Sequence, residues 1–107
     1  MDLRATATTV ADTPTVVCDG VVDLASLAVF RDALLRAVHA NAGRTVLVDL
    51  DEVAALDDSG LGVLLGAAAA ARQSDGDLEI VCNNDRLRIR LERTRLDRAL
   101  TVRRSIS

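Results

Sequence analysis

The sequence predicts one layered α/β domain. Stretches with the β-branched, apolar character of strands alternate along the chain with stretches whose apolar residues recur every three or four positions, as in amphipathic helices. The chain has 107 residues and a mass of 11.4 kDa, which is enough for one hydrophobic core without metal or disulfide support. It contains no repeat, low-complexity tract or linker, so we expect a single domain over residues 1–107.

The N-terminal third predicts a hairpin followed by a helix. Residues 3–10 suit an edge strand and residues 15–19 form a short β-branched run, so the two can pair across a turn at 11–14 that contains Pro14. The sequence "GVVD" then turns the chain, and an amphipathic helix is expected over 25–39. The core-facing positions of this helix are Leu27, Phe30, Leu34, Leu35 and Val38.

The remainder continues the alternation. Residues 44–50 predict a strand covered on both faces, 59–72 a helix, and 78–82 a further strand. Residues 85–93 fit either a strand or a helix, and we favour a helix because it preserves the alternation of a layered α/β domain. A short strand over about 100–104 would close the sheet.

The charge pattern favours a protein partner over nucleic acid. The net charge is −3, and all 13 basic residues are arginines; residues 1–58 carry −6 and residues 59–107 carry +3. The arginine-rich stretch 86–104 is interrupted by acids and lacks aromatic residues for base stacking, so a solvated helix face is favoured over a surface for nucleic acid or anionic lipid. No run is long and apolar enough for a membrane span, and no signal peptide is present, so we expect a soluble, cytoplasmic protein.

The cysteines and the histidine give no sign of a metal site. Cys18 and Cys82 lie far apart in apolar surroundings, which favours buried, reduced thiols, with a disulfide as the lesser alternative. His39 lies near the end of a predicted helix and suits a surface position there. The acidic residues around 51–58 lack the ligand spacing of a calcium loop.

Residues 56–62, "LDDSGLG", place Ser59 where a strand passes into a helix, a position from which α/β domains often present functional groups. One interpretation is purely structural: Ser59 caps the helix, and Asp57 and Asp58 interact favourably with its dipole. No base suitable for a serine nucleophile accompanies it, and the G-x-S-x-G elbow and the G-x-G-x-x-G phosphate loop are absent, so we expect no enzyme.

The helix after Ser59 points to a docking surface. Successive helix residues are about 100° apart, so one face of this helix is expected to hold the core residues. The opposite face carries small or apolar residues, although the solvent-facing side of a helix is usually charged. The expected core residues are Leu61, Leu64, Leu65 and Ala68; the opposite face carries Gly62, Val63, Gly66 and Ala70. This second face needs cover, either from a partner or from another element of the same fold. A phosphate on Ser59, at the head of that face, would turn a docking surface strongly anionic.

The segment "TVLVDLDEVAALDDSGLGVLLGA" resembles the central part of STAS domains, in particular bacterial anti-sigma factor antagonists, whose motif is Asp, a small hydroxyl residue, Ser and Gly-Leu-Gly. "DGVVDLASLAVFRDALLRAV" is similar to the family's turn and first helix, and "LERTRLDRAL" to its C-terminal part. The resemblance implies a mixed, mostly parallel sheet of four or five strands flanked by three or four helices.

The resemblance also implies a function. Ser59 matches a phosphoacceptor that an anti-sigma factor with serine kinase activity modifies. The unmodified protein captures that anti-sigma factor and frees a sigma factor for transcription; phosphorylation releases the partner, and a serine phosphatase resets the switch. ATP and magnesium belong to the kinase, so no cofactor is expected on this chain. Asp57, Gly60, Leu61 and Gly62 match the family motif, and we expect the partner-binding residues to be Asp23, Asp57, Asp58, Gly60, Leu61, Gly62, Val63 and Gly66.

Two other functions stay open. One is a STAS adaptor in a larger regulatory or lipid-transport assembly, with Ser59 only a cap, and the other is weak nucleotide binding around residues 57–66. Two residues depart from the family pattern. Asp58 replaces the small hydroxyl residue and adds charge beside Ser59, and Arg95 replaces a glycine where a positive φ is often needed.

Overall fold

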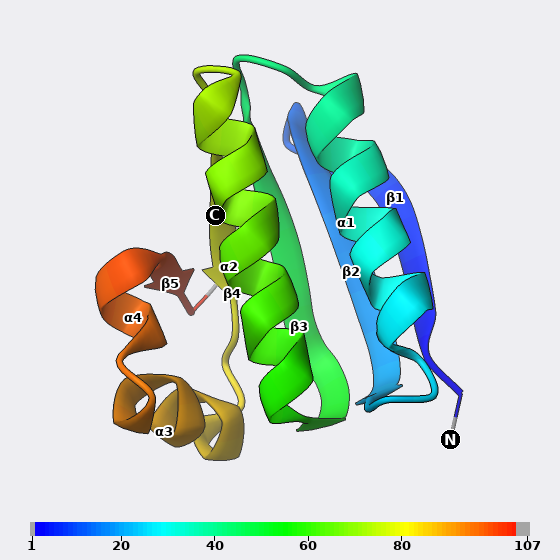
Figure 1. Ribbon diagram of the computed structural model, residues 1–107, viewed down its shortest axis with the longest axis vertical. Coiled ribbons are helices and arrows are strands. Elements are labelled where there is room, and N and C mark those ends of the chain that lie inside the picture. The colour runs from blue at the N-terminus through cyan, green and yellow to red at the C-terminus, as the bar shows by residue number, and fades with distance from the viewer. Residues whose placement is uncertain (1, 105–107) are drawn as a thin grey trace.

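The computed structural model describes residues 2–104 as an α/β domain with a five-stranded sheet (Figure 1). The sheet order is β1-β2-β3-β4-β5; β1 runs antiparallel to β2, and all other neighbours are parallel. The strands are β1 Arg4–Val10, β2 Thr13–Val22, β3 Thr45–Leu56, β4 Asp77–Val81 and β5 Thr101–Arg103. The helices are α1 Leu27–Ala40, α2 Asp58–Gln73, α3 Asp85–Arg93 and α4 Leu96–Ala99. The predicted fold class is therefore confirmed.

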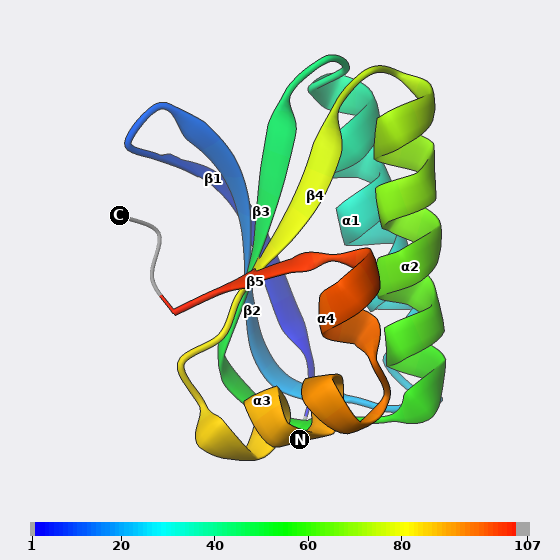
Figure 2. The same ribbon diagram turned by 90° about the vertical axis from the view of Figure 1, so that its left-hand side faces the viewer.

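The parallel connections place α1 and α2 side by side. Helix α1 links β2 to β3 and α2 links β3 to β4, and Figure 2 shows both helices on the same side of the sheet. Successive crossovers of the same hand between neighbouring parallel strands produce this arrangement. Helix α3 lies near the end of the sheet where α2 begins (Figure 1), and the short α4 contacts α2, since Arg72 donates a hydrogen bond to the Ala99 carbonyl at 2.7 Å.

Strand β2 is longer than predicted at both ends. Ala11 and Asp12 form the turn with φ values of 50° and 65°, and Pro14, expected in the loop, lies within the strand opposite Thr9. At the other end, the predicted turn at 20–23 is mostly strand. This extension requires glycine at position 20. Gly20 has a φ of 120°, and a Cβ there would overlap the carbonyl oxygen of Asp2.

Strand β3 also continues beyond the predicted 44–50, as far as Leu56. Residues 52–56 pair with the second half of β2, with one irregularity in register before this segment and a second within it. Val53 and Leu56 are both buried although they are three residues apart, because the second irregularity in register falls between them and brings both side chains to the core. The longer strand fixes where α2 starts.

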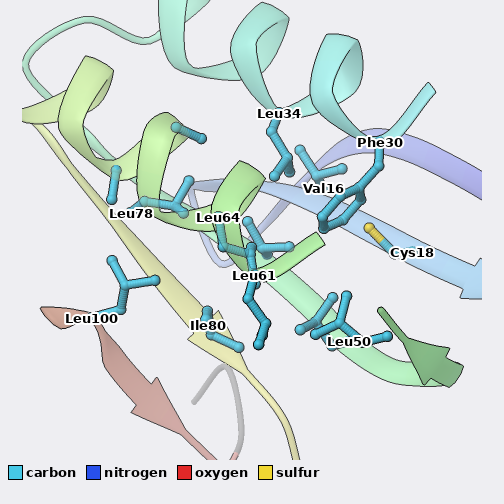
Figure 3. Close-up of a cluster of buried hydrophobic side chains, with 14 of the residues drawn as sticks. Val16, Cys18, Phe30, Leu34, Leu50, Leu61, Leu64, Leu78, Ile80 and Leu100 are labelled. Carbon is cyan, nitrogen blue, oxygen red and sulfur yellow. The ribbon is translucent and has the colours of Figure 1, made fainter. Parts of the chain in front are cut away.

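Mainly leucine, valine and alanine side chains from the sheet and from all four helices form the core, part of which Figure 3 shows. Phe30 and Leu34 of α1 lie over Val16 and Cys18 of β2, and all four are fully buried (Figure 3). Both cysteines are free and buried, as predicted. Burial, with a smaller effect from the Asp49 carboxylate, raises the pKa of the Cys18 thiol to about 12, so this thiol is protonated at neutral pH.

One predicted core residue of α2 is not in the core. Leu65 is 41% exposed, whereas Leu64 is fully buried. The buried side of the helix is completed by three alanines: Ala67, Ala68 and Ala71. These short side chains let α2 lie close to the sheet and to α1, and the helix is rotated accordingly, so Leu65 is turned outward.

The C-terminal part of the chain confirms the predicted helix at 85–93. Asn84 caps α3, since its side-chain oxygen accepts hydrogen bonds from the amides of Arg86 at 3.0 Å and Leu87 at 3.4 Å. Arg95 has a φ of 60°, an uncommon value for a residue with a side chain, and so keeps the backbone expected of a glycine. It directly precedes α4 as its N-cap residue, and the sequence did not predict this short helix.

Among residues 2–104, no helix combines the length and apolar character needed to cross a membrane. His39 is exposed in the last turn of α1, as predicted.

The outward rotation of Leu65 gives a direct test of the packing. Leu64→Ala should lower the free energy of unfolding by about 3 kcal/mol because it leaves a cavity in the core. Leu65→Ala should lower it by less than about 1 kcal/mol. Chemical denaturation of the two variants and the parent protein measures both values, and a larger loss for Leu65→Ala would contradict the helix orientation.

Candidate functional site

The start of α2 is held by the ends of two strands. The Asp57 amide donates a hydrogen bond to the Val22 carbonyl at the end of β2, at 2.8 Å. Asp57 is the N-cap residue, with extended φ and ψ of −74° and 160°, and its carboxylate accepts a hydrogen bond from the Asp58 amide at 2.7 Å. Asp57 thus performs the capping that the structural interpretation of the motif had given to Ser59.

Ser59 is the second residue of α2, and the interpretation of this serine as the helix cap is wrong. Its Oγ is buried and has no hydrogen-bond partner among the described residues. A buried hydroxyl without a partner is destabilising, because it has given up its hydrogen bonds to water. The fold therefore gives this hydroxyl no structural role.

Gly60 fills the tightest position in the site. A Cβ on this residue would lie 2.7 Å from Leu56 Cδ1 and 2.8 Å from Val22 Cγ1. The first turn of α2 therefore approaches the ends of β2 and β3 more closely than a residue with a side chain allows. Leu61 is also buried, so Gly60 and Leu61 shape the site from beneath.

The outer face of α2 is bare. Gly62 and Gly66 are exposed, and a Cβ at either position would meet no atom within 4 Å. Val63 and Ala70, which the sequence also placed on this face, are half-buried and packed at the edge of the core. Another element of the fold thus covers only part of the predicted face.

A groove between α1 and α2 joins these residues. It encloses about 390 Å³ and is lined by Ser59, Gly62, Val63, Gly66 and Ala67 of α2 and by Arg31 and Leu35 of α1. The sequence analysis missed the two α1 residues as part of the site and placed Leu35 in the core, although it is only half-buried. Their spacing of four, which puts Arg31 and Leu35 on one helix face, is the signal that could have found them.

Asp58 lies on the other side of the helix start. It is separated from Ser59 by about 100° around the axis, and it forms an ion pair with Arg90 of α3, with a distance of 2.5 Å between Nη2 and Oδ1. The Asp58 side chain is 85% exposed, so the pair adds little to stability, but it directs this charge away from the Ser59 groove. Arg90 was not predicted as part of the site.

Asp23 lies in the loop between β2 and α1. Its Oδ1 accepts hydrogen bonds from the Ser26 amide at 3.1 Å and the Ser26 hydroxyl at 3.2 Å, and its own amide donates to Ser26 Oγ at 3.0 Å. This reciprocal pair fixes the turn that leads into α1. Leu24 beside it is the most exposed large hydrophobic residue within 2–104, at 76%.

Residues 5–103 match the profile of the family described as "Mlab, STAS domain". The chain belongs to the STAS family. Several solved structures resemble this STAS domain in fold. An anti-sigma factor antagonist from Mycobacterium paratuberculosis is 17% identical, with a TM-score of 0.86 over 97% of this chain and 87% of the other.

Two further structures resemble this STAS domain. A putative anti-sigma factor antagonist from Thermotoga maritima is 18% identical, with a TM-score of 0.83 over 95% of this chain and 87% of the other. The anti-sigma factor antagonist SpoIIAA in its unphosphorylated form is 19% identical, with a TM-score of 0.72 over 92% and 87%. At these identities the likeness establishes the fold alone. Among curated protein sequences, none matches this chain at a significant level.

The glycines of α2 give a matched test of the site geometry. Gly66→Ala should raise the free energy of unfolding by about 1 kcal/mol, because alanine favours a helix and meets nothing there. Gly60→Ala, the same chemical change in the same helix, should instead lower it by about 1–2 kcal/mol because its methyl group crowds Val22 and Leu56. Gly62→Ala is the control and should behave like Gly66→Ala. Equal gains for all three variants in chemical denaturation would contradict the close approach at Gly60.

Proposed function

We propose that this STAS domain is an anti-sigma factor antagonist switched by phosphorylation of Ser59. In its unmodified form it binds an anti-sigma factor that is also a serine kinase, and so frees a sigma factor for transcription. Phosphorylation releases the partner, and a serine phosphatase restores binding. The observation that carries the proposal is the position of Ser59, a hydroxyl without a structural partner at the end of a groove that the fold leaves open.

The two exposed glycines support docking on this face. Glycine inside a helix costs about 1 kcal/mol relative to alanine, and neither Gly62 nor Gly66 contacts another part of the chain that would require it. Because these glycines have no side chain, the backbone or side chains of a second protein can approach α2 closely. Arg31 and Leu35 supply a charge and an apolar contact on the opposite wall, and Asp23 fixes the turn that leads into that helix.

A phosphate on Ser59 would change the charge of this surface. It adds about −1.5 to −2 charges at neutral pH, close to the carboxylates of Asp57 and Asp58. Arg31 forms no ion pair within residues 2–104 and lines the same groove, so it is placed to pair with the phosphate. The ion pair between Arg31 and the phosphate would fill part of the groove. The remaining negative charge would repel an acidic partner surface.

Asp58, the departure from the family motif, is compatible with this switch. Its carboxylate is paired with Arg90 and points toward α3, so it adds less charge to the Ser59 groove than its place in the sequence implies. Modification does require movement, since Ser59 Oγ is covered in the conformation described here. Rotation about χ1 to another staggered position would turn the hydroxyl toward the groove.

The family profile keeps a second function in view. The matched profile is described as "Mlab, STAS domain", so an adaptor module in a larger regulatory or lipid-transport assembly is the alternative. Such an adaptor can use the same α1/α2 groove without any chemistry at Ser59. Under either proposal residues 1–107 act as one cytoplasmic STAS domain, without a cofactor and without direct contact to nucleic acid.

The switch is tested by incubating the protein with the cognate anti-sigma factor kinase that the proposal requires, together with ATP and Mg²⁺. Intact-mass spectrometry should show one added phosphate on the parent protein and on Ser74→Ala, a control at the far end of α2, and none on Ser59→Ala. Ser59→Ala should bind the kinase like the unmodified parent. Ser59→Asp should bind it at least about tenfold more weakly, a difference of about 1.4 kcal/mol. Equal binding by the two variants would remove the switch.

The docking face is tested in the same binding assay. Gly66→Arg places a long side chain in the groove without disturbing the fold, and it should abolish binding. Thr6→Arg introduces the same residue at an exposed position of the edge strand β1 and should leave binding unchanged. The adaptor would be favoured if the kinase does not phosphorylate the parent chain but still binds it, and if Gly66→Arg abolishes that binding.

A further inference from the structure

A second and larger cavity lies on the other side of the α2 start. It encloses about 720 Å³ between the end of β3, the first residue of α2 and the outer face of α3. Its lining residues are Ala54, Ala55, Leu56, Asp58, Arg86, Leu87, Ile89, Arg90, Arg93 and Thr94. The volume falls within the range of roughly 300–1,000 Å³ typical of small-molecule sites. It shares no lining residue with the groove at Ser59.

The charge around this cavity is strongly one-sided. Helix α3 contributes three arginines, and the only acid in the lining, Asp58, is already paired with Arg90. Arg86 and Arg93 are exposed and form no ion pair within the described part of the chain. The Nε of Arg90 is buried without an acceptor among the described residues. The cavity therefore offers cationic donors that the fold does not use.

The floor of the same cavity is apolar. Leu56 and Leu87 close it from the core, and Ala54 and Ala55 are exposed along the β3 end. Ile89 is 48% exposed on α3, one of the few large hydrophobic side chains of the described residues that water reaches to this extent. An apolar surface next to unpaired guanidinium groups matches a ligand that has both characters.

We propose that this cavity binds a small amphiphilic anion with a phosphate or carboxylate head group and a short apolar body. Arg86 and Arg93 bind the head group, and the apolar body lies on Ile89 and the alanines of β3. The arginine-rich stretch thus has a specific role in binding an anion. From the sequence alone, a solvated helix face was favoured for this stretch. The site does not include Ser59, so this proposal is tested independently of the phosphorylation switch.

The probe is octyl phosphate below its micelle concentration, added to the ¹⁵N-labelled chain and followed by NMR. We expect saturable shifts confined to residues 54–58 and 86–94. Inorganic phosphate, which has the charge alone, and octyl glucoside, which has the chain alone, should each bind at least about tenfold more weakly because each uses only half of the site. Equal affinity for inorganic phosphate would overturn the amphiphile, and the absence of saturable shifts would overturn the site.

Matched variants separate the site from general charge and hydrophobicity. The double variant Arg86→Gln/Arg93→Gln should lose at least about tenfold in affinity for octyl phosphate, while Arg98→Gln/Arg104→Gln, with the same change in net charge at exposed positions outside the cavity, should keep it. Ile89→Ser should weaken binding, and Val29→Ser, an exposed position on α1, should not. Similar losses in the two double variants would assign the binding to net charge and overturn the proposal.

Two other occupants are also tested. Vesicles containing phosphatidylglycerol present the same phosphate chemistry as a membrane surface, and binding to them without binding of dispersed octyl phosphate would overturn a small-molecule site. An acidic peptide with one leucine tests a protein partner, and saturable binding of this peptide alone would likewise overturn the proposal. The proposal is supported if dispersed octyl phosphate binds and if vesicles or the peptide displace it from Arg86 and Arg93.

Discussion

The junction at Gly60 sets the geometry of the whole site. Backbone and side chains from the ends of β2 and β3 converge on the first turn of α2, and a Cβ at this residue would lie within 3 Å of both Val22 and Leu56. The Asp57 amide ties the same turn to the Val22 carbonyl. Because the turn is held on two sides, the directions in which Ser59 and Asp58 leave the helix are fixed by the sheet rather than by the surface loop.

This constraint gives the two neighbouring residues different surroundings. Ser59 lines the groove toward α1, whereas Asp58 lines the cavity toward α3 and pairs with Arg90. The ion pair with Arg90 thereby directs the Asp58 charge, which looks unfavourable in a phosphoacceptor motif, away from the Ser59 groove. The first turn of α2 thus separates a smooth, weakly charged surface from a cationic one.

Much of this organisation could be predicted from the sequence. Periodicity predicted the alternation of strands and helices, and the glycines at 62 and 66 marked a bare helix face that the structure exposes. What failed depended on how elements pack together. Leu65 has the spacing of a core residue, but three alanines let α2 rotate toward the sheet. Ser59 has the chemistry of a cap, but the extension of β3 to Leu56 makes Asp57 the capping residue.

The partners of the site residues were beyond sequence reasoning for the same reason. Arg31 and Arg90 lie about 30 residues on either side of the motif, and only the placement of α1 and α3 around α2 brings them to it. Nothing local in "LDDSGLG" indicates which arginine each neighbouring residue meets.

Hydrogen–deuterium exchange with and without the bound anti-sigma factor tests the central claim most directly, because it locates the docking face without any substitution. The account predicts that binding slows exchange in residues 59–70 of α2 and 28–35 of α1, and that phosphorylated protein shows no such change when the partner is added. Slower exchange confined to β1, or the same protection before and after phosphorylation, would contradict a switchable interface built on the α1/α2 groove.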